Sequence, residues 1–315
     1  MSARHVTVPA FAKINLGLRI LYKRPDNYHE LRTVFQTISL QDSLTLSFEP
    51  SVETVVRIDG TPEIADNLVD RAARAVLSHL GRNGTVHCVL KKRIPSGAGL
   101  GGGSSDAAAV LLALPFLMGE AVPMTTLSAL GAKLGSDVPF FLYGGTALGL
   151  GRGEELYPLP DFPAQNGLLV TPPVHSSTPE AYKALSAGLT SFSLQNKLDS
   201  FQQEVWSGVP AADGNDFESV VFDRHPELRG IKDSLLGSGA SFSAMSGSGS
   251  SVFGFFSSAG GAKLAAAELG DYPAHLFELV SRADYRRVWA EALGISGAIQ
   301  NQTIGMEWPP QNPHE

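Results

Sequence analysis

The chain has 315 residues, 43% hydrophobic and 17% charged, a composition that fits a folded protein of two domains and excludes a largely disordered chain. Its 24 basic and 31 acidic residues give a formal net charge of −7, which argues against nucleic acid or an anionic membrane as the main ligand. Cys88 is the only cysteine, so no internal disulfide can form and a reduced, cytoplasmic location is expected. Residues 1–9 lack the apolar run of a signal peptide, and no stretch approaches the roughly 20 apolar residues that span a bilayer.

The first third of the chain predicts strands joined by tight turns. Apolar and polar side chains alternate around positions 44–48, and short apolar runs follow at 55–58 and 86–90. Between these two runs, Asp66-Asn67 is expected to open a helix, and Gly81 stands where a C-cap glycine belongs. Apolar residues recur at helical spacing between the caps, at Leu68, Ala72, Val76 and Leu80.

A glycine-rich loop then leads into an alanine-rich helix predicted over 107–114. Glycines permit close backbone approach to a ligand, and a run of amides before a helix start favours an anion such as phosphate. Two serines at its end can cap the helix and offer hydroxyls to a phosphate or its magnesium. The loop, with its flanks, is Pro95, Ser96, Gly97, Ala98, Gly99, Leu100, Gly101, Gly102, Gly103, Ser104 and Ser105.

Three other interpretations of this loop are weaker. A flexible linker fits poorly between a good strand and a good helix. The spacing of Gly97, Gly99 and Gly102 satisfies the dinucleotide fingerprint G-x-G-x-x-G, but Glu120 follows the same helix instead of ending a second strand. A Walker A loop is excluded because no Lys-Ser or Lys-Thr follows at the required spacing.

Prolines at 158, 160 and 163 indicate a boundary between domains. Beyond it, we expect strands at 168–170 and 252–256, the second preceded by a glycine-serine loop, and helices at 217–222, 227–236 and 263–269. The predicted division is 1–160, 161–295 and a loose tail at 296–315. No cysteine–histidine cluster has zinc-ligand spacing, so no metal site built by the protein is expected.

Three segments resemble the signature motifs of the GHMP kinases in order and in spacing: Pro9–Leu18, Pro95–Ser105 and Met245–Phe253. The resemblance implies a two-domain α+β fold. An N-terminal α/β sheet domain would hold the glycine-rich phosphate loop, a ferredoxin-like domain would follow, and the active site would lie in the cleft between them. It also implies ATP as the phosphoryl donor, with Mg²⁺ bound through ATP and not through a protein cage.

Three shorter segments resemble one branch of that family: Ala12–Leu16, Asn27–Leu31 and Gly135–Phe141; Asn215–Glu218 also resembles a family segment. Members of the branch phosphorylate the 2-hydroxyl of 4-diphosphocytidyl-2-C-methyl-D-erythritol in non-mevalonate isoprenoid precursor synthesis. The sequence departs from the family pattern at Asn27, where glycine is frequent, at Asp106, where asparagine is common, and in the extra stretch after Trp289.

The resemblance implies roles for individual residues. Asp137 matches the catalytic aspartate and Lys13 the lysine beside it, while Asn67 and Lys92 match positions near the nucleotide. Five further residues match substrate contacts, with the aromatic ones expected around the cytosine base: Asn15, Tyr28, His29, Thr178 and Tyr182.

Each of these residues also has a purely structural interpretation. Asp137 precedes Val138-Pro139 and can be a helix N-cap, Lys13 can be a solvated strand lysine, and Asn15 can be a structural hydrogen-bonding residue. Other hypotheses for the whole chain are a homoserine- or mevalonate-type GHMP kinase, a non-catalytic metabolite-binding regulator on the same scaffold and, remotely, a Rossmann oxidoreductase. The expected assembly is a monomer or weak homodimer.

Overall fold

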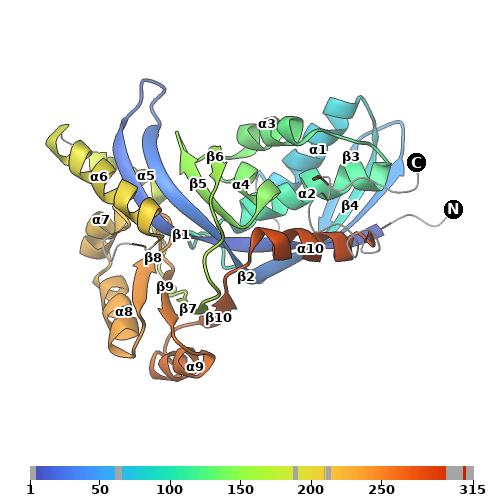
Figure 1. Ribbon diagram of the computed structural model, residues 1–315. Coiled ribbons are helices and arrows are strands. Elements are labelled where there is room, and N and C mark those ends of the chain that lie inside the picture. The colour runs from blue at the N-terminus through green and yellow to red at the C-terminus, as the bar shows by residue number, and fades with distance from the viewer. Residues whose placement is uncertain are drawn as a thin grey trace.

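A long antiparallel hairpin runs through the middle of the molecule (Figure 1). Its strands are β1 (His5–Lys23) and β2 (His29–Pro50), and their register shifts at three points, after Phe11, Asn15 and Ile20. Such bulges increase the local twist and re-aim side chains. Both strands belong to the first sheet, and β1 also packs against the second, so the hairpin contributes to both halves of the fold. The computed structural model describes residues 5–60, 66–186, 191–208, 210, 214–295 and 308–309.

The first sheet is built around β2. Its path is β3-β4-β2-β5-β6, with β1 paired to β2, and all neighbours are antiparallel except β3 and β4. The remaining strands of this sheet are β3 (Val55–Asp59), β4 (Gly84–Lys91), β5 (Thr146–Leu150) and β6 (Glu155–Pro158).

Four helices pack against this sheet. Helix α2 (Gly102–Met118) lies at their centre, and α1 (Leu68–Leu80), α3 (Met124–Leu134) and α4 (Val138–Tyr143) pack around it. Every side chain from Ala107 to Leu114 is buried, as expected for a helix that is apolar on all sides. Because α2 is surrounded by the sheet and the other helices, the loop before it is held at a fixed place.

The second sheet has the strand order β10-β7-β9-β8, all antiparallel, which is the order of a ferredoxin-like unit. Its strands are β7 (Asn166–Val170), β8 (Phe242–Met245), β9 (Val252–Phe256) and β10 (Ala274–Glu278). One face is covered by α8 (Pro226–Gly237) and α9 (Ala259–Glu268), with α7 (Phe217–Arg224) beside α8 (Figure 1). The other face packs on β1, and Ile14 belongs to the same hydrophobic cluster as Phe253 and Phe277.

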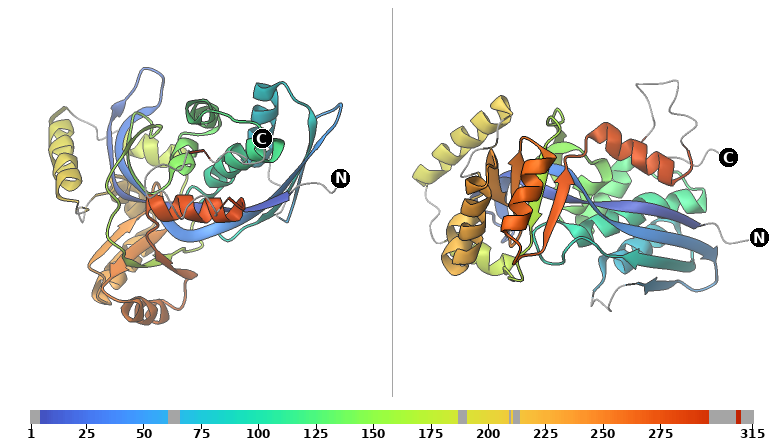
Figure 2. Two further views of the ribbon diagram at one scale, coloured as in Figure 1. Left: turned by 45° about the vertical axis from the view of Figure 1, so that its right-hand side comes forward. Right: turned by 90° about the horizontal axis from the view of Figure 1, so that it is seen from below.

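The C-terminal part of the chain returns to the first sheet. Helix α10 (Arg282–Ala292) lies along β1 (Figure 2), and Trp289 enters the same core as α2. Helices α5 (Thr178–Ser186) and α6 (Ser191–Ser207) lie near the tip of the hairpin. Most of the predicted tail at 296–315 falls outside the described residues, but Trp308 packs against α10. The proposed domain boundaries stay a prediction.

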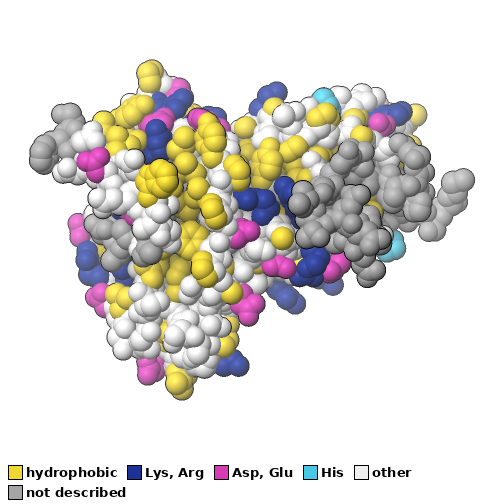
Figure 3. Space-filling view, in the orientation of Figure 1, with side chains coloured by type: hydrophobic (Ala, Val, Ile, Leu, Met, Phe, Trp, Pro, Cys, Tyr) yellow, Lys and Arg dark blue, Asp and Glu magenta, His cyan; other side chains and the backbone are white. Residues whose placement is uncertain are grey.

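The predicted elements are confirmed, from the strands around 44–48, 55–58, 86–90, 168–170 and 252–256 to the five helices of the two halves. Helix α2 begins five residues earlier than predicted, because the serine pair forms its first turn. Within the described ranges, no helix is both long and apolar enough to cross a membrane. Basic and acidic side chains are interspersed over the face shown in Figure 3.

Candidate active site

A cavity of about 1010 Å³ opens between the two halves of the fold. One side is lined by the first glycine loop, defined as Pro95–Ser105, through Gly97, Gly99, Gly101 and Ser104. These three glycines have φ values of 69°, 79° and 71°, in the left-handed region that other residues rarely adopt. The loop runs directly into α2, whose first amides have no partner inside the helix.

The first glycine loop is bonded to a second one from the other half of the molecule. The second glycine loop, Ser246–Ser251, joins β8 to β9. Its Ser246 hydroxyl donates to the carbonyl oxygen of Gly99 at 3.0 Å, and the Ser251 amide donates to that of Ala98 at 3.2 Å. A Cβ on Gly99 would lie 2.1 Å from the Ser246 carbonyl oxygen, so glycine is needed for this close approach. The shape of the first loop therefore depends on both halves.

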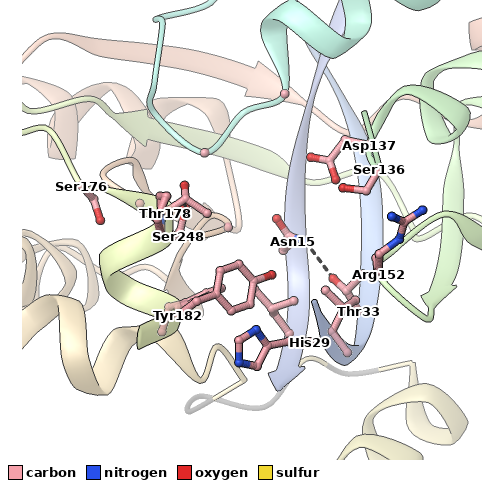
Figure 4. Close-up of a pocket in the computed structure, with 18 of the residues that line it drawn as sticks. Asn15, His29, Thr33, Ser136, Asp137, Arg152, Ser176, Thr178, Tyr182 and Ser248 are labelled. Atoms are coloured by element: carbon pink, nitrogen blue, oxygen red, sulfur yellow. Dashed lines mark hydrogen bonds between the residues drawn. The ribbon is translucent and has the colours of Figure 1, made fainter. Parts of the chain in front are cut away.

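Lys13 and Asp137 face each other beside the first glycine loop. The Lys13 Nζ lies 3.7 Å from Asp137 Oδ2 and donates to Asn15 Oδ1 at 2.6 Å. Asn15 in turn donates to the Thr33 hydroxyl at 2.7 Å (Figure 4). Lys13 is only 4% exposed. Burial lowers its pKa below the ordinary value, and the nearby Asp137 carboxylate opposes that shift.

These contacts bear on the structural interpretations of the three residues. Lys13 is buried in the cavity wall and is not a solvated strand lysine. Asp137 occupies the N-cap position of α4, but its side chain makes no capping hydrogen bond to the described residues. Its carboxylate lines the cavity instead (Figure 4). Asn15 does have a structural part, because it fixes the position of the Lys13 ammonium.

Aromatic side chains lie at another part of the same cavity. His29 and Tyr182 stack with ring centroids 4.7 Å apart and an angle of 16° between the rings. Tyr28 is 56% exposed, and the Arg152 guanidinium lies 4.7 Å from its ring centroid. Thr178, at the start of α5, shares a 2.7 Å hydrogen bond with Ser248. Burial and the charge of Asp137 raise the pKa of Tyr182 to about 12, so its hydroxyl stays protonated at neutral pH.

Similarity to known proteins identifies the family of this chain. The models of the GHMP kinases N terminal domain and the GHMP kinases C terminal domain match residues 67–145 and 199–275. A 4-diphosphocytidyl-2-C-methyl-D-erythritol kinase of Solibacter usitatus (strain Ellin6076) is 50% identical over 99% of this chain and 98% of its own length. The chain belongs to the GHMP kinase family. The family and the two-domain α+β fold predicted from the sequence are thus confirmed.

One further relative and two solved structures are also similar to this chain. The 4-diphosphocytidyl-2-C-methyl-D-erythritol kinase of Pelobacter propionicus is 42% identical over 84% of this chain and 95% of its own length. A crystal structure of 4-(cytidine 5'-diphospho)-2C-methyl-D-erythritol kinase is 37% identical, with a TM-score of 0.72 over 87% of this chain and 98% of that chain. Homoserine kinase from Cytophaga hutchinsonii, at 18% identity and a TM-score of 0.63 over 88% of this chain and 95% of that chain, shares the fold.

Two residues predicted near the nucleotide of this GHMP kinase have structural contacts of their own. Asn67 caps α1, where its Oδ1 accepts from the Val69 amide at 2.9 Å. Lys92 donates to Asp42 at 2.5 Å and to Asp106 at 2.8 Å, behind the first turn of α2. A direct contact of either residue with the nucleotide stays a prediction.

Arg152 and Asn215 are two residues that bear on the site and were not assigned a role from the sequence. Arg152 comes from the turn between β5 and β6, and a Gly-Arg-Gly turn alone does not predict a cavity residue. Asn215 is buried, and its side-chain amide donates to the carbonyl oxygens of Met245 and Gly247 at 2.7 and 2.8 Å. It therefore fixes the second glycine loop. The resemblance of Asn215–Glu218 to a segment of the family is the sequence signal that could have indicated this role.

Proposed function

We propose that this GHMP kinase transfers the γ-phosphoryl group of ATP to the 2-hydroxyl group of 4-diphosphocytidyl-2-C-methyl-D-erythritol. One observation carries the proposal. The first glycine loop, the Lys13–Asp137 pair and the His29–Tyr182 stack line a single cavity of about 1010 Å³. This arrangement allows a nucleotide phosphate, a reacting hydroxyl and a flat base to be bound together.

Phosphoryl transfer of this kind depends mainly on positioning and charge stabilisation. Asp137 is at the right place to orient the attacking hydroxyl or accept its proton, because its carboxylate faces the cavity and is not used as a helix cap. The Lys13 ammonium, fixed by Asn15, can offset charge on the transferring group. In a buried position such a charge is screened little by water, which strengthens its effect.

The part of the cavity beside the first glycine loop fits the phosphoryl donor, ATP with Mg²⁺. The left-handed glycines let the backbone approach phosphate oxygens, and the start of α2 favours negative charge. Magnesium would be bound through the phosphates, and the loop residue Ser104, which lines the cavity, offers a hydroxyl there. No group of three or more histidine, cysteine or acidic side chains among the described residues is arranged to hold a metal ion.

The part of the cavity with the aromatic side chains fits the phosphoryl acceptor, a cytidine diphosphate. Tyr28, His29 and Tyr182 offer ring faces for cytosine, and Arg152 and Lys23 also line the cavity and can neutralise a diphosphate. With one buried cysteine and a net charge of −7, we propose a cytoplasmic enzyme without a nucleic-acid or membrane partner, acting as a monomer or weak homodimer.

The test is ATP consumption with a panel of acceptors: diphosphocytidyl-methylerythritol, mevalonate, homoserine and galactose. We expect turnover with the first acceptor alone, and mass spectrometry of the product should show one added phosphoryl group. Turnover with mevalonate or homoserine instead would assign the chain to another GHMP activity. ATP binding without turnover of any acceptor would support a regulator.

A further inference from the structure

Helix α4 begins immediately after Asp137 and has only six residues, Val138–Tyr143. A helix this short is marginal by itself, since too few hydrogen bonds offset the cost of nucleating it. Its last carbonyl oxygens have no partner inside the helix. The orientation of Asp137 therefore depends on what binds the other end of α4.

Those carbonyl oxygens accept hydrogen bonds from residues outside the helix. The Gly144 amide donates to Phe140 at 3.0 Å, and the Tyr285 hydroxyl donates to Phe141. The indole Nε1 of Trp308 donates to the carbonyl oxygen of Leu142 at 2.6 Å. Two of these three donors thus come from the C-terminal part of the chain.

The turn after α4 is shaped to admit α10. Gly144 and Gly145 have φ values of 63° and 74°. A Cβ on Gly144 would lie 2.3 Å from the Tyr285 ring, and one on Gly145 would lie 2.7 Å from Arg282. The backbone of the turn therefore packs directly against α10, and the Tyr285 ring is only 2% exposed there.

Trp308 packs against the same helix, α10. Its ring lies edge-on to Tyr285, with centroids 6.1 Å apart, and edge-on to Trp289 at 6.5 Å. The Arg286 guanidinium lies 5.6 Å from its ring centroid. Four independent contacts, including the bond to Leu142, thus fix the indole.

We propose that Trp308 is a positioning residue for the phosphoryl transfer, acting through α4 on Asp137. The inference rests on the catalytic role proposed for Asp137. Leu142 lies five positions after Asp137, a rise of about 7.5 Å along a helix, so a shift at one end is transmitted to the other. Misplacement of a reacting group by about 1 Å can cost ~10²-fold in rate.

The test compares Trp308→Phe with Trp206→Phe. Phenylalanine keeps much of the ring packing but removes the N–H donor to Leu142. Trp206, on α6, is 82% exposed and serves as the matched control. We expect Trp308→Phe to lower kcat about tenfold, as a misplacement of Asp137 smaller than about 1 Å would. KM for ATP and the affinity for ATP by calorimetry should change little, and Trp206→Phe should match the unmodified chain.

A double variant separates positioning from general stability. If Trp308 acts through Asp137, Trp308→Phe should cost little further turnover in an Asp137→Asn background, because the two losses are not additive. An unchanged kcat in Trp308→Phe would overturn the inference while leaving the proposed function intact, provided Asp137→Asn alone is impaired. Equal loss of kcat in Trp206→Phe, or a parallel loss of ATP affinity in Trp308→Phe, would also overturn it.

Discussion

The buried Lys13 ammonium is stabilised by a short chain of polar side chains. Asn15 accepts from Lys13 and donates to Thr33, whose hydroxyl donates to the carbonyl oxygen of Gly17 at 2.7 Å. A buried charge without such partners would neutralise or be expelled to solvent. Lys13 lies between two register shifts of β1, after Phe11 and after Asn15, and bulges of this kind re-aim the side chains beside them.

Asp137→Asn tests the catalytic role of the carboxylate. Asparagine keeps the shape and the ability to cap α4, since it caps about as well as aspartate. We expect turnover to fall by ~10²–10⁴-fold, the usual range for a general base. The melting temperature and ATP affinity should change little. Turnover above about a tenth of the original, outside that range, would make Asp137 a scaffold residue.

At the scale of elements, an ionic cluster ties β2 and β4 to the helix behind the first glycine loop. Lys92 bridges Asp42 and Asp106, and Asp42 also accepts from the Ile94 amide at 2.8 Å. Within the described part of the chain, Asp106 Oδ1 has no hydrogen-bond partner. Burial raises the pKa of Asp106 to about 7, a shift opposed by Lys92 and reinforced by Asp42.

This raised pKa predicts a pH-dependent effect of Asp106→Asn. Between 3.8, the ordinary value, and about 7, the folded protein binds the Asp106 proton more tightly than the unfolded chain. Stability from this group is therefore lost as pH rises through that window. We expect the free energy of unfolding of Asp106→Asn, relative to the original, to increase from pH 4 to pH 7 in urea titrations. A difference independent of pH would contradict the assignment.

The first glycine loop can be probed with a pair of matched substitutions. Gly101 is a poor choice, because its Cβ would lie 2.6 Å from the Phe141 ring. A Cβ on Gly97 meets only His175, at 3.5 Å, and one on Gly239 meets nothing within 4 Å. Both glycines have a positive φ, so alanine should destabilise both by a similar amount, about 1–2 kcal/mol. We expect only Gly97→Ala to weaken ATP binding in calorimetry; equal ATP affinities would remove Gly97 from the nucleotide site.

At the scale of the whole molecule, the sequence predicted local patterns well and long-range contacts poorly. The caps at Asn67 and Gly81 bound a helix that is found where it was expected, because capping and periodicity act within a few residues. By contrast, Asn215 meets the second glycine loop 32 residues further on, and Trp308 meets α4 166 residues away. No local pattern records such contacts. The pairing of Lys13 with Asp137 came from the family resemblance alone.

The whole cavity can be tested for cytidine with thermal unfolding. A ligand that binds only the folded protein raises the melting temperature. At a hundred times its Kd, it stabilises the folded state by about 2.7 kcal/mol. We expect CMP and CDP to produce such a shift. Tyr28→Ala should remove most of it while leaving the ATP-induced shift in place, because Tyr28 lies in the turn between β1 and β2 and not in the first glycine loop.

Tyr22 provides the control for this experiment, because it lies on the same hairpin and is 47% exposed. Tyr22→Ala should retain the cytidine response in full. The Arg152 guanidinium stacks on Tyr28, so Arg152→Gln should weaken the CDP shift more than the CMP shift, since CDP carries the additional phosphate. Absence of any shift with several millimolar CMP or CDP would exclude a cytidine site in this cavity. The acceptor would then be sought among substrates without a base.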